Sequence, residues 1–217
     1  MHSFLTANNF NILTKEPTEK FHKLIHKTMQ ESNLIIDKKQ IKSLTQKKAS
    51  PRTLKAQLKL HKADIPIRPV INNRTAPAYK LARHLTKILD QYISLNNYFN
   101  VTNSTNLAND LTKLEIDENH RMICFDIKDL YVSVPIDETL NIVKTKLLQS
   151  NNIQITYQML SLLKIVPSQN YSTFQQKKTY QPEQDISMGS PISSLIAEIL
   201  LQHYEDANIK QRLDTRA

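Results

Sequence analysis

The chain contains a single glycine, Gly189, in 217 residues. At the average usage of about 7%, a chain of this length would contain roughly fifteen. Glycine-rich phosphate loops of the Walker or dinucleotide-binding kind are therefore excluded, because each needs several glycines at fixed spacing. A protein of this composition that handles phosphates must use Lys, Arg or a metal ion. Asn is abundant instead, and it takes left-handed turn conformations at lower cost than other non-glycine residues.

Composition and terminal features predict an intracellular globular protein. Hydrophobic residues make up 40% of the chain and charged residues 23%, and 217 residues can form one sizeable domain or two small ones. No run of about 18 apolar residues is present, so no membrane span is expected. The N-terminus lacks the basic start and long apolar core of a secretory signal. The single cysteine, Cys124, excludes an intramolecular disulfide and fits a reducing compartment.

The charge balance indicates a polyanionic partner. Lys and Arg number 29 against 20 Asp and Glu, which gives a formal net charge of +9. Such an excess is typical of proteins that bind nucleic acid, and we expect a nuclear location. Many nuclear and ribosome-associated proteins are basic without being enzymes, so charge alone does not separate an enzyme from a binding protein.

The N-terminal part of the chain is predicted to be helical. Residues 18–48 are polar and lysine-rich, and apolar residues recur at helical spacing from Phe21 to Met29. This pattern predicts one amphipathic helix, followed by a short extended or helical piece at 34–36. The basic linker at 47–52 contains a proline and ends any helix before it.

The next segment predicts a basic hairpin. Residues 54–62 and 67–71 have the patterns of two short strands around a turn, and Pro69 favours an edge position for the second strand. Several cations on one hairpin suit a triphosphate or a phosphate backbone. The alternative is a solvated basic face without a ligand. The candidate cations are Lys59, His61, Lys62 and Arg68.

Helical periodicity continues in the rest of the chain, with one more hairpin. A strongly apolar helix is expected after Pro191. The second hairpin is expected at 171–174 and 178–181. The other predicted helices cover 77–95, 107–114, 135–149 and 157–166.

The stretch 122–131, MICFDIKDLY, contains the main candidate for a metal ligand. Its apolar start predicts a buried strand with Asp126 at the end, and Tyr131 follows five residues later. A carboxylate at the end of a core strand is costly to bury unless a cation or a partner compensates it. The alternatives are that Asp126 caps the next turn or pairs with a lysine. Cys124 is expected to be a small core residue rather than a nucleophile.

The stretch 187–193, SMGSPIS, precedes the apolar helix and contains the only glycine. Without a side chain at Gly189, a ligand or a strand could approach the backbone closely. The alternative is a plain helix N-terminus, with Ser190 as the cap and Pro191 in the first turn. The two interpretations are compatible.

In this order, the segments resemble a reverse transcriptase, and in detail the Penelope-like retroelements. A basic hairpin is followed by a strand with Asp-x-x-x-x-Tyr, by a second hairpin and by Met-Gly-Ser-Pro before a helix. The similar stretches are LHK at 60–62, IPIRPV at 65–70, YKLAR at 79–83, LTKIL at 85–89, FDIKDLY at 125–131 with VP at 134–135, and MGSPIS at 188–193. The resemblance covers roughly residues 51–205.

The resemblance implies an α+β, helix-rich fold with the fingers and part of the palm of a right-hand polymerase. An N-terminal helical extension would cover 1–50, the fingers 51–121, and a partial palm 122–217. The palm would be an antiparallel sheet backed by helices. The implied activity is RNA-directed DNA polymerisation in a retrotransposon, with an RNA template, a DNA primer and dNTPs as partners.

The resemblance also assigns catalytic and metal roles. Asp126 would be the catalytic carboxylate that binds Mg²⁺ in a two-ion nucleotidyl-transfer centre, and Ile127 would add a main-chain carbonyl ligand. Tyr131 would lie beneath the incoming sugar and reject a 2′ hydroxyl.

Binding roles are implied for the basic hairpin and for the glycine segment. Arg68 and Lys59 would hold the triphosphate, and Gly189 would line the nascent base pair. The residues implied in contacts with nucleic acid are His61, Lys62, Met188 and Ser190.

The sequence departs from the reverse transcriptase pattern at the second catalytic motif. The family has two adjacent aspartates on a later hairpin, and no Asp-Asp pair occurs in these 217 residues. The acidic pair Glu205–Asp206 falls at the expected end of the last helix. One carboxylate cannot hold two Mg²⁺ ions at working geometry. We therefore expect a truncated or decayed copy that does not polymerise by itself.

Three interpretations stay open at this point. The chain is a reverse transcriptase domain by descent, or it is a non-catalytic nucleic-acid-binding remnant or interaction module. The third is that it does not fold stably alone, because a palm without its central hairpin leaves strand edges unpaired. The sequence does not determine an oligomeric state.

Overall fold

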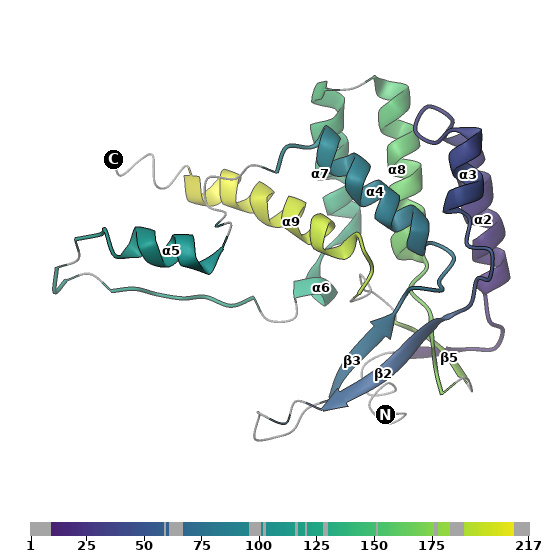
Figure 1. Cartoon of the computed structure of the whole chain (residues 1–217), viewed down its shortest axis with the longest axis horizontal. Helices are drawn as coiled ribbons and strands as arrows, with labels where there is room; N and C mark the ends of the chain where they lie inside the picture. The colour runs from purple at the N-terminus through teal and green to yellow at the C-terminus, as the bar shows by residue number, and fades with distance from the viewer. Residues whose placement is uncertain are drawn as a thin grey trace.

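The computed structural model is an α+β fold in which a layer of helices lies beside a mixed sheet (Figure 1). The structure describes residues 10–58, 60, 67–95, 101, 103–115, 117–119, 121–127, 130–150, 152–175, 178–182 and 189–210. Most of the helices are in the upper part of Figure 1, with the sheet below them. This arrangement confirms the predicted α+β class.

The described strands form a five-stranded sheet in the order β1-β5-β4-β2-β3. The strands are β1 Phe10–Leu13, β2 Arg52–Leu58, β3 Ile67–Asn72, β4 Ser172–Phe174 and β5 Lys178–Pro182. The pairs β1–β5, β5–β4 and β2–β3 are antiparallel, whereas β2 and β4 are parallel. The expectation of a wholly antiparallel sheet is therefore wrong. The hairpin β4–β5 follows a long helical crossover and joins β2 in parallel.

Strands from all three predicted regions take part in this sheet. β1 belongs to the expected N-terminal extension, β2 and β3 to the expected fingers, and β4 and β5 to the expected palm. The boundaries at 50 and 121 remain predictions.

Helix α5, Ser104–Leu111, projects to one side in Figure 1. The last helix continues into a π-helical turn, η1 Glu205–Lys210, so the acidic pair lies at a helix end as predicted. The α-helices are α2 Thr18–Glu31, α3 Lys38–Leu44, α4 Tyr79–Tyr92, α5 Ser104–Leu111, α6 Leu130–Ser133, α7 Ile136–Ser150, α8 Ile153–Ser168 and α9 Ser193–Tyr204.

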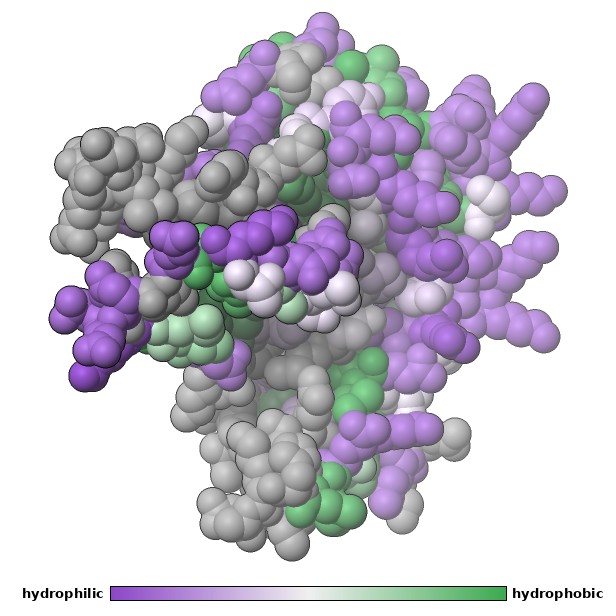
Figure 2. All heavy atoms as spheres, turned by 60° about the vertical axis from the view of Figure 1, so that its left-hand side comes forward, coloured by the Kyte–Doolittle hydropathy of each residue, from purple (hydrophilic) through white to green (hydrophobic). Residues whose placement is uncertain are grey.

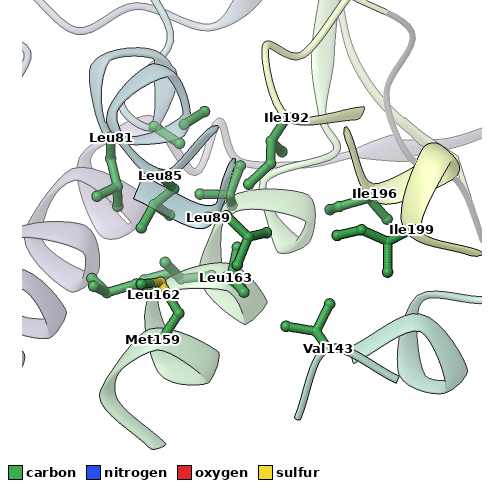
Figure 3. Packing of buried hydrophobic residues seen from close by; sticks show 14 of the residues in the cluster. Leu81, Leu85, Leu89, Val143, Met159, Leu162, Leu163, Ile192, Ile196 and Ile199 are labelled. Carbon is green, nitrogen blue, oxygen red and sulfur yellow. The ribbon is translucent and has the colours of Figure 1, made fainter. Parts of the chain in front are cut away.

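One hydrophobic core joins these helices, with the exception of α5 (Figure 3). Leu81, Leu85 and Leu89 repeat along one face of α4, and all three are fully buried. This spacing of four residues places them on the same side of a helix, as the sequence pattern predicted. The other labelled core residues are Val143 from α7, Met159, Leu162 and Leu163 from α8, and Ile192, Ile196 and Ile199 at α9.

Helix boundaries differ from the predicted ones where a polar cap decides them. α8 begins earlier than expected because the Asn152 side chain accepts a hydrogen bond from the backbone N–H of Gln154 (2.7 Å). After α2 the chain forms a turn and then α3, a second helix. Asp37 begins α3 with a capping box, in which its side chain accepts from Gln40 N at 2.7 Å.

The two predicted hairpins are confirmed. β2 and β3 pair in antiparallel register, and β3 lies at the edge of the described sheet, the position that Pro69 favoured. β4 and β5 form the second hairpin. The turn at 63–66 lies outside the described residues.

The predicted strand before Asp126 is wrong. Residues 121–127 have no regular secondary structure, and no described strand pairs with them. Met122, Ile123 and Phe125 are 73%, 69% and 88% exposed, and Cys124 is exposed rather than in the core. A short apolar run becomes a buried strand only where neighbouring strands accept its backbone hydrogen bonds. Here the described sheet is built from other segments.

On the face shown in Figure 2, the coloured residues are mostly hydrophilic, with small separate hydrophobic patches. No helix among the described residues has the length and apolar character needed to cross a bilayer.

Candidate nucleotide and nucleic-acid site

Gly189 lies directly against strand β3, which carries the Arg68 motif. Its φ angle is +93°, in the region that favours glycine. A Cβ built on Gly189 would lie 2.7 Å from the main-chain oxygen of Ile71 and 3.3 Å from Nδ2 of Asn73. The predicted close approach at this glycine is therefore real, but the approaching group is a strand of the protein.

The segment after Gly189 is attached to α4 rather than capped by a side chain. The alternative interpretation, in which Ser190 caps the helix, is wrong, because the N-cap position of α9 is Ile192 and has no side-chain hydrogen bond. Ser190 instead accepts a hydrogen bond at its main-chain oxygen from Ser193 N (3.1 Å). Thr86 Oγ1 of α4 donates to the carbonyl of Pro191 at 3.2 Å. The turn at 191–192 therefore precedes the helix instead of forming its first turn.

The motif with Tyr131 is connected to the Gly189 turn through α9, the helix that follows this turn. Tyr131 is on the short helix α6, half-buried against the main core, and α6 contacts α9. The turn at Gly189, just before α9, lies on β3, and α6 contacts α9 itself. Two motif segments, β3 and α6, are therefore linked through the Gly189 turn and the helix that follows it.

Asp126 and Ile127 are on the exposed segment that leads to α6. Ile127 is 52% exposed, and no described residue forms a hydrogen bond or ion pair with the Asp126 carboxylate. Among the described residues, no three or more His, Cys, Asp or Glu side chains come together in a way that could hold a metal ion. The described donors therefore do not fit a two-Mg²⁺ centre, which needs several carboxylate oxygens around both ions.

Several predicted binding residues fall outside the described part of the chain. Arg68 is described by its main chain, which is in register with Gln57 of β2. The residues outside the described ranges are Lys59, His61, Lys62 and Met188.

A buried arginine borders this site, and the sequence analysis did not single it out. Arg52, at the start of β2, is 3% exposed, and its Nε donates to the carbonyl oxygen of Tyr171 at 2.7 Å. Its Nη2 has no hydrogen-bond partner among the described residues. Burial lowers the pKa of Arg52 to about 10. The side chain stays charged at neutral pH, and no described carboxylate compensates it.

Polar side chains around Tyr171 hold this part of the sheet to the helices. The Tyr171 hydroxyl lies 2.7 Å from Thr18 Oγ1, and Gln169 Nε2 donates to it at 3.2 Å. Burial raises the pKa of Tyr171, against the lowering effect of both hydrogen bonds. Gln169 Oε1 also accepts from Ala78 N at 2.9 Å. This network links α2 and the start of α4 to the strand residues beside Arg52.

A cavity of about 20 Å³ lies between Arg52, Asn73, Gln169 and Ser190. A volume of this size holds about one water molecule. The cavity is too small for a nucleotide, and apolar side chains such as Ala82, Val166 and Ile192 form much of its lining. The sequence pattern did not predict this cavity, because Arg52 and Gln169 are far apart in the sequence.

The protein was compared with family models, with curated proteins and with solved structures, and none of the three comparisons gave a match.

Proposed function

We propose that this protein binds nucleic acid as a reverse-transcriptase-like domain and does not polymerise DNA by itself. The observation that carries the proposal is the contact of two motif segments, β3 and α6, with residues 189–204. Gly189 lies against Ile71 of β3, and α6 with Tyr131 contacts α9. In the resemblance, the segments on these elements hold the triphosphate, the sugar and the nascent base pair. Their spatial association supports a common descent from such a site.

The catalytic part of the proposal is limited by the available carboxylates. In the family, acids from two motifs hold the two Mg²⁺ ions that activate the primer oxygen and neutralise the leaving pyrophosphate. This sequence has Asp126 without an Asp-Asp pair. The function that remains is binding to a polyanion, for which the net charge of +9 provides the attraction.

The test uses the purified chain and a fluorescent RNA–DNA hybrid of about 20 base pairs. Fluorescence anisotropy measures affinity from 50 to 200 mM salt, with Mg²⁺ or with a chelator. We expect binding that weakens with salt, because phosphate contacts release counterions. We also expect that Mg²⁺ does not strengthen binding, and that the Asp126→Ala variant binds as tightly as the unmodified protein.

Two results would contradict the proposal in different ways. No binding to the hybrid at 50 mM salt would remove nucleic acid as the partner. Primer extension that depends on Mg²⁺ and on Asp126 would show that the chain is a polymerase after all.

A second candidate function is a protein-interaction module, supported by the exposed apolar segment at 121–127. Phe125 is 88% exposed, and its neighbours Met122 and Ile123 are almost as accessible. Contiguous exposed apolar side chains often mark interaction surfaces. If this segment mediates self-association, sedimentation would show a concentration-dependent oligomer that Phe125→Ser abolishes. A monomer at all concentrations would exclude self-association.

A further inference from the structure

The positive charge of this protein is concentrated in one segment. Residues 38–63 contain nine Lys and Arg and no Asp or Glu. The formal charge of this segment therefore equals the net charge of the whole chain, +9. The other residues contain 20 Lys and Arg and 20 Asp and Glu, so they are neutral as a set. Attraction to a polyanion therefore comes from this segment.

The described lysines of this segment are exposed and lie on consecutive elements. Figure 1 shows α3 and the connection after it at the right edge, followed directly by β2, which extends toward the lower left. An open groove of about 840 Å³ between α2 and α3 has three of these lysines in its lining. The name basic strip is used for Lys38, Lys39, Lys42, Lys47, Lys48 and Lys55.

The basic strip is not neutralised within the described part of the protein. No salt bridge there involves any of its lysines, whereas Lys23 and Lys27 of the neighbouring helix α2 are paired with Glu19 and Glu31. The nearest acid in sequence, Asp37, accepts a hydrogen bond from the backbone of α3. The lysines of the strip are thus available to an external anion.

Hydrogen bonds fix the connection between α3 and β2. His22 Nε2 lies 3.0 Å from the carbonyl oxygen of Gln46, and Lys80 Nζ donates to the carbonyl of Thr45 at 3.3 Å. Ser50 N donates to the carbonyl of Thr75 at 3.0 Å. These contacts attach the connection to α2, to α4 and to the turn after β3. Lys47 and Lys48 are therefore presented from a fixed backbone, which lowers the entropy cost of binding.

We propose that the basic strip binds the phosphate backbone of duplex nucleic acid, independently of base sequence. Residues 38–63 contain no Phe, Tyr or Trp and one histidine, His61, so the segment offers few aromatic side chains for unpaired bases to stack on. Ammonium groups on a fixed surface suit the regular phosphates of a duplex. The inference rests on the proposed function and adds the binding surface and the form of the nucleic acid.

The test compares two variants with the same change in charge. The strip variant replaces Lys39, Lys42 and Lys48 with Gln. The matched control replaces three exposed or half-exposed lysines elsewhere, Lys113, Lys146 and Lys164, with Gln. Affinity for the RNA–DNA hybrid, and for each of its single strands, is measured by anisotropy from 50 to 200 mM salt. Thermal unfolding verifies that both variants fold.

We expect the strip variant to bind the hybrid at least about 10-fold more weakly at 0.1 M salt. The slope of log K against log salt should also become shallower, by up to about 3, because up to three phosphate contacts are lost. The control should lose less than about 3-fold. Equal losses in the two variants, or tighter binding of a single strand than of the hybrid, would overturn the inference. Absence of hybrid binding by the unmodified protein would instead contradict the proposed function itself.

Discussion

Gly189 and Ile71 approach so closely that a side chain on the glycine would collide with the backbone of β3. The Cβ of an alanine there would lie 2.7 Å from the Ile71 main-chain oxygen. This contact fixes the turn before α9 to the edge strand of the described sheet. It explains why the chain has its only glycine at this position.

Gly189→Ala should lower the free energy of unfolding by about 1–3 kcal/mol or more. The residue has a positive φ, and the atom that the new Cβ would meet belongs to the backbone. Urea unfolding followed by circular dichroism measures the effect. Removing the Asn73 side chain in the same protein should not restore stability, since the oxygen of Ile71 remains. Ser194→Ala, on the exposed side of α9, is the control and should be nearly neutral. An unchanged midpoint for Gly189→Ala would show that β3 and Gly189 are not in contact.

Phe125→Ser should change the free energy of unfolding by less than about 0.5 kcal/mol, because the ring is 88% exposed. The buried Leu163 provides the contrast: Leu163→Ala leaves a cavity among the helices and should cost about 2–5 kcal/mol. Both variants are compared by urea unfolding. If Phe125→Ser cost as much as Leu163→Ala, residues 121–127 would belong to the core after all.

Arg52→Met should be as stable as the unmodified protein or more stable. The substitution loses the hydrogen bond to Tyr171 O, worth about 1.5–3 kcal/mol, but it also removes a buried charge whose desolvation costs several kcal/mol. The methionine side chain keeps most of the volume. Arg52→Ala leaves a cavity instead and should be destabilised by about 2–4 kcal/mol. Equal destabilisation by Met and by Ala in thermal unfolding would mean that the charge itself is compensated.

His84 should make the protein less stable as the pH falls below 6.5. Burial, and then the nearby Lys87, lower the pKa of His84 from 6.5. Below pH 6.5 the unfolded chain therefore binds more protons at this group than the folded chain does. The contribution of the neutral His84 ring to the free energy of unfolding is complete above pH 6.5. It is lost as the pH falls towards the pKa that His84 has in the folded protein.

The measurement for His84 is urea unfolding at pH 7 and pH 5. His84→Leu should show a smaller loss of stability between the two than the unmodified protein. Lys87→Gln removes the second cause of the shift and should give an intermediate loss. Identical losses in all three proteins would show that His84 does not titrate differently on folding.

The elements that depend on neighbours along the chain were predictable from the sequence. The leucines of α4 repeat every four residues and so define a buried face without reference to any other segment. The hairpin β2–β3 is also local, and Pro69 placed its second strand at an edge because proline cannot donate a ladder hydrogen bond.

Contacts between segments far apart in the sequence decided the burial of Arg52 and the exposure of residues 121–127. Arg52 is buried because β2 pairs in parallel with β4, which brings it to Tyr171, 119 residues away in sequence. The apolar run before Asp126 has the composition of a core strand, yet it stays exposed because the described sheet is formed by other strands. Sequence by itself determined most of the helical segments, although not α3 and α6, and where positive charge accumulates. Only the tertiary structure decided which strands are neighbours, because pairing between distant segments leaves no periodic pattern in either one.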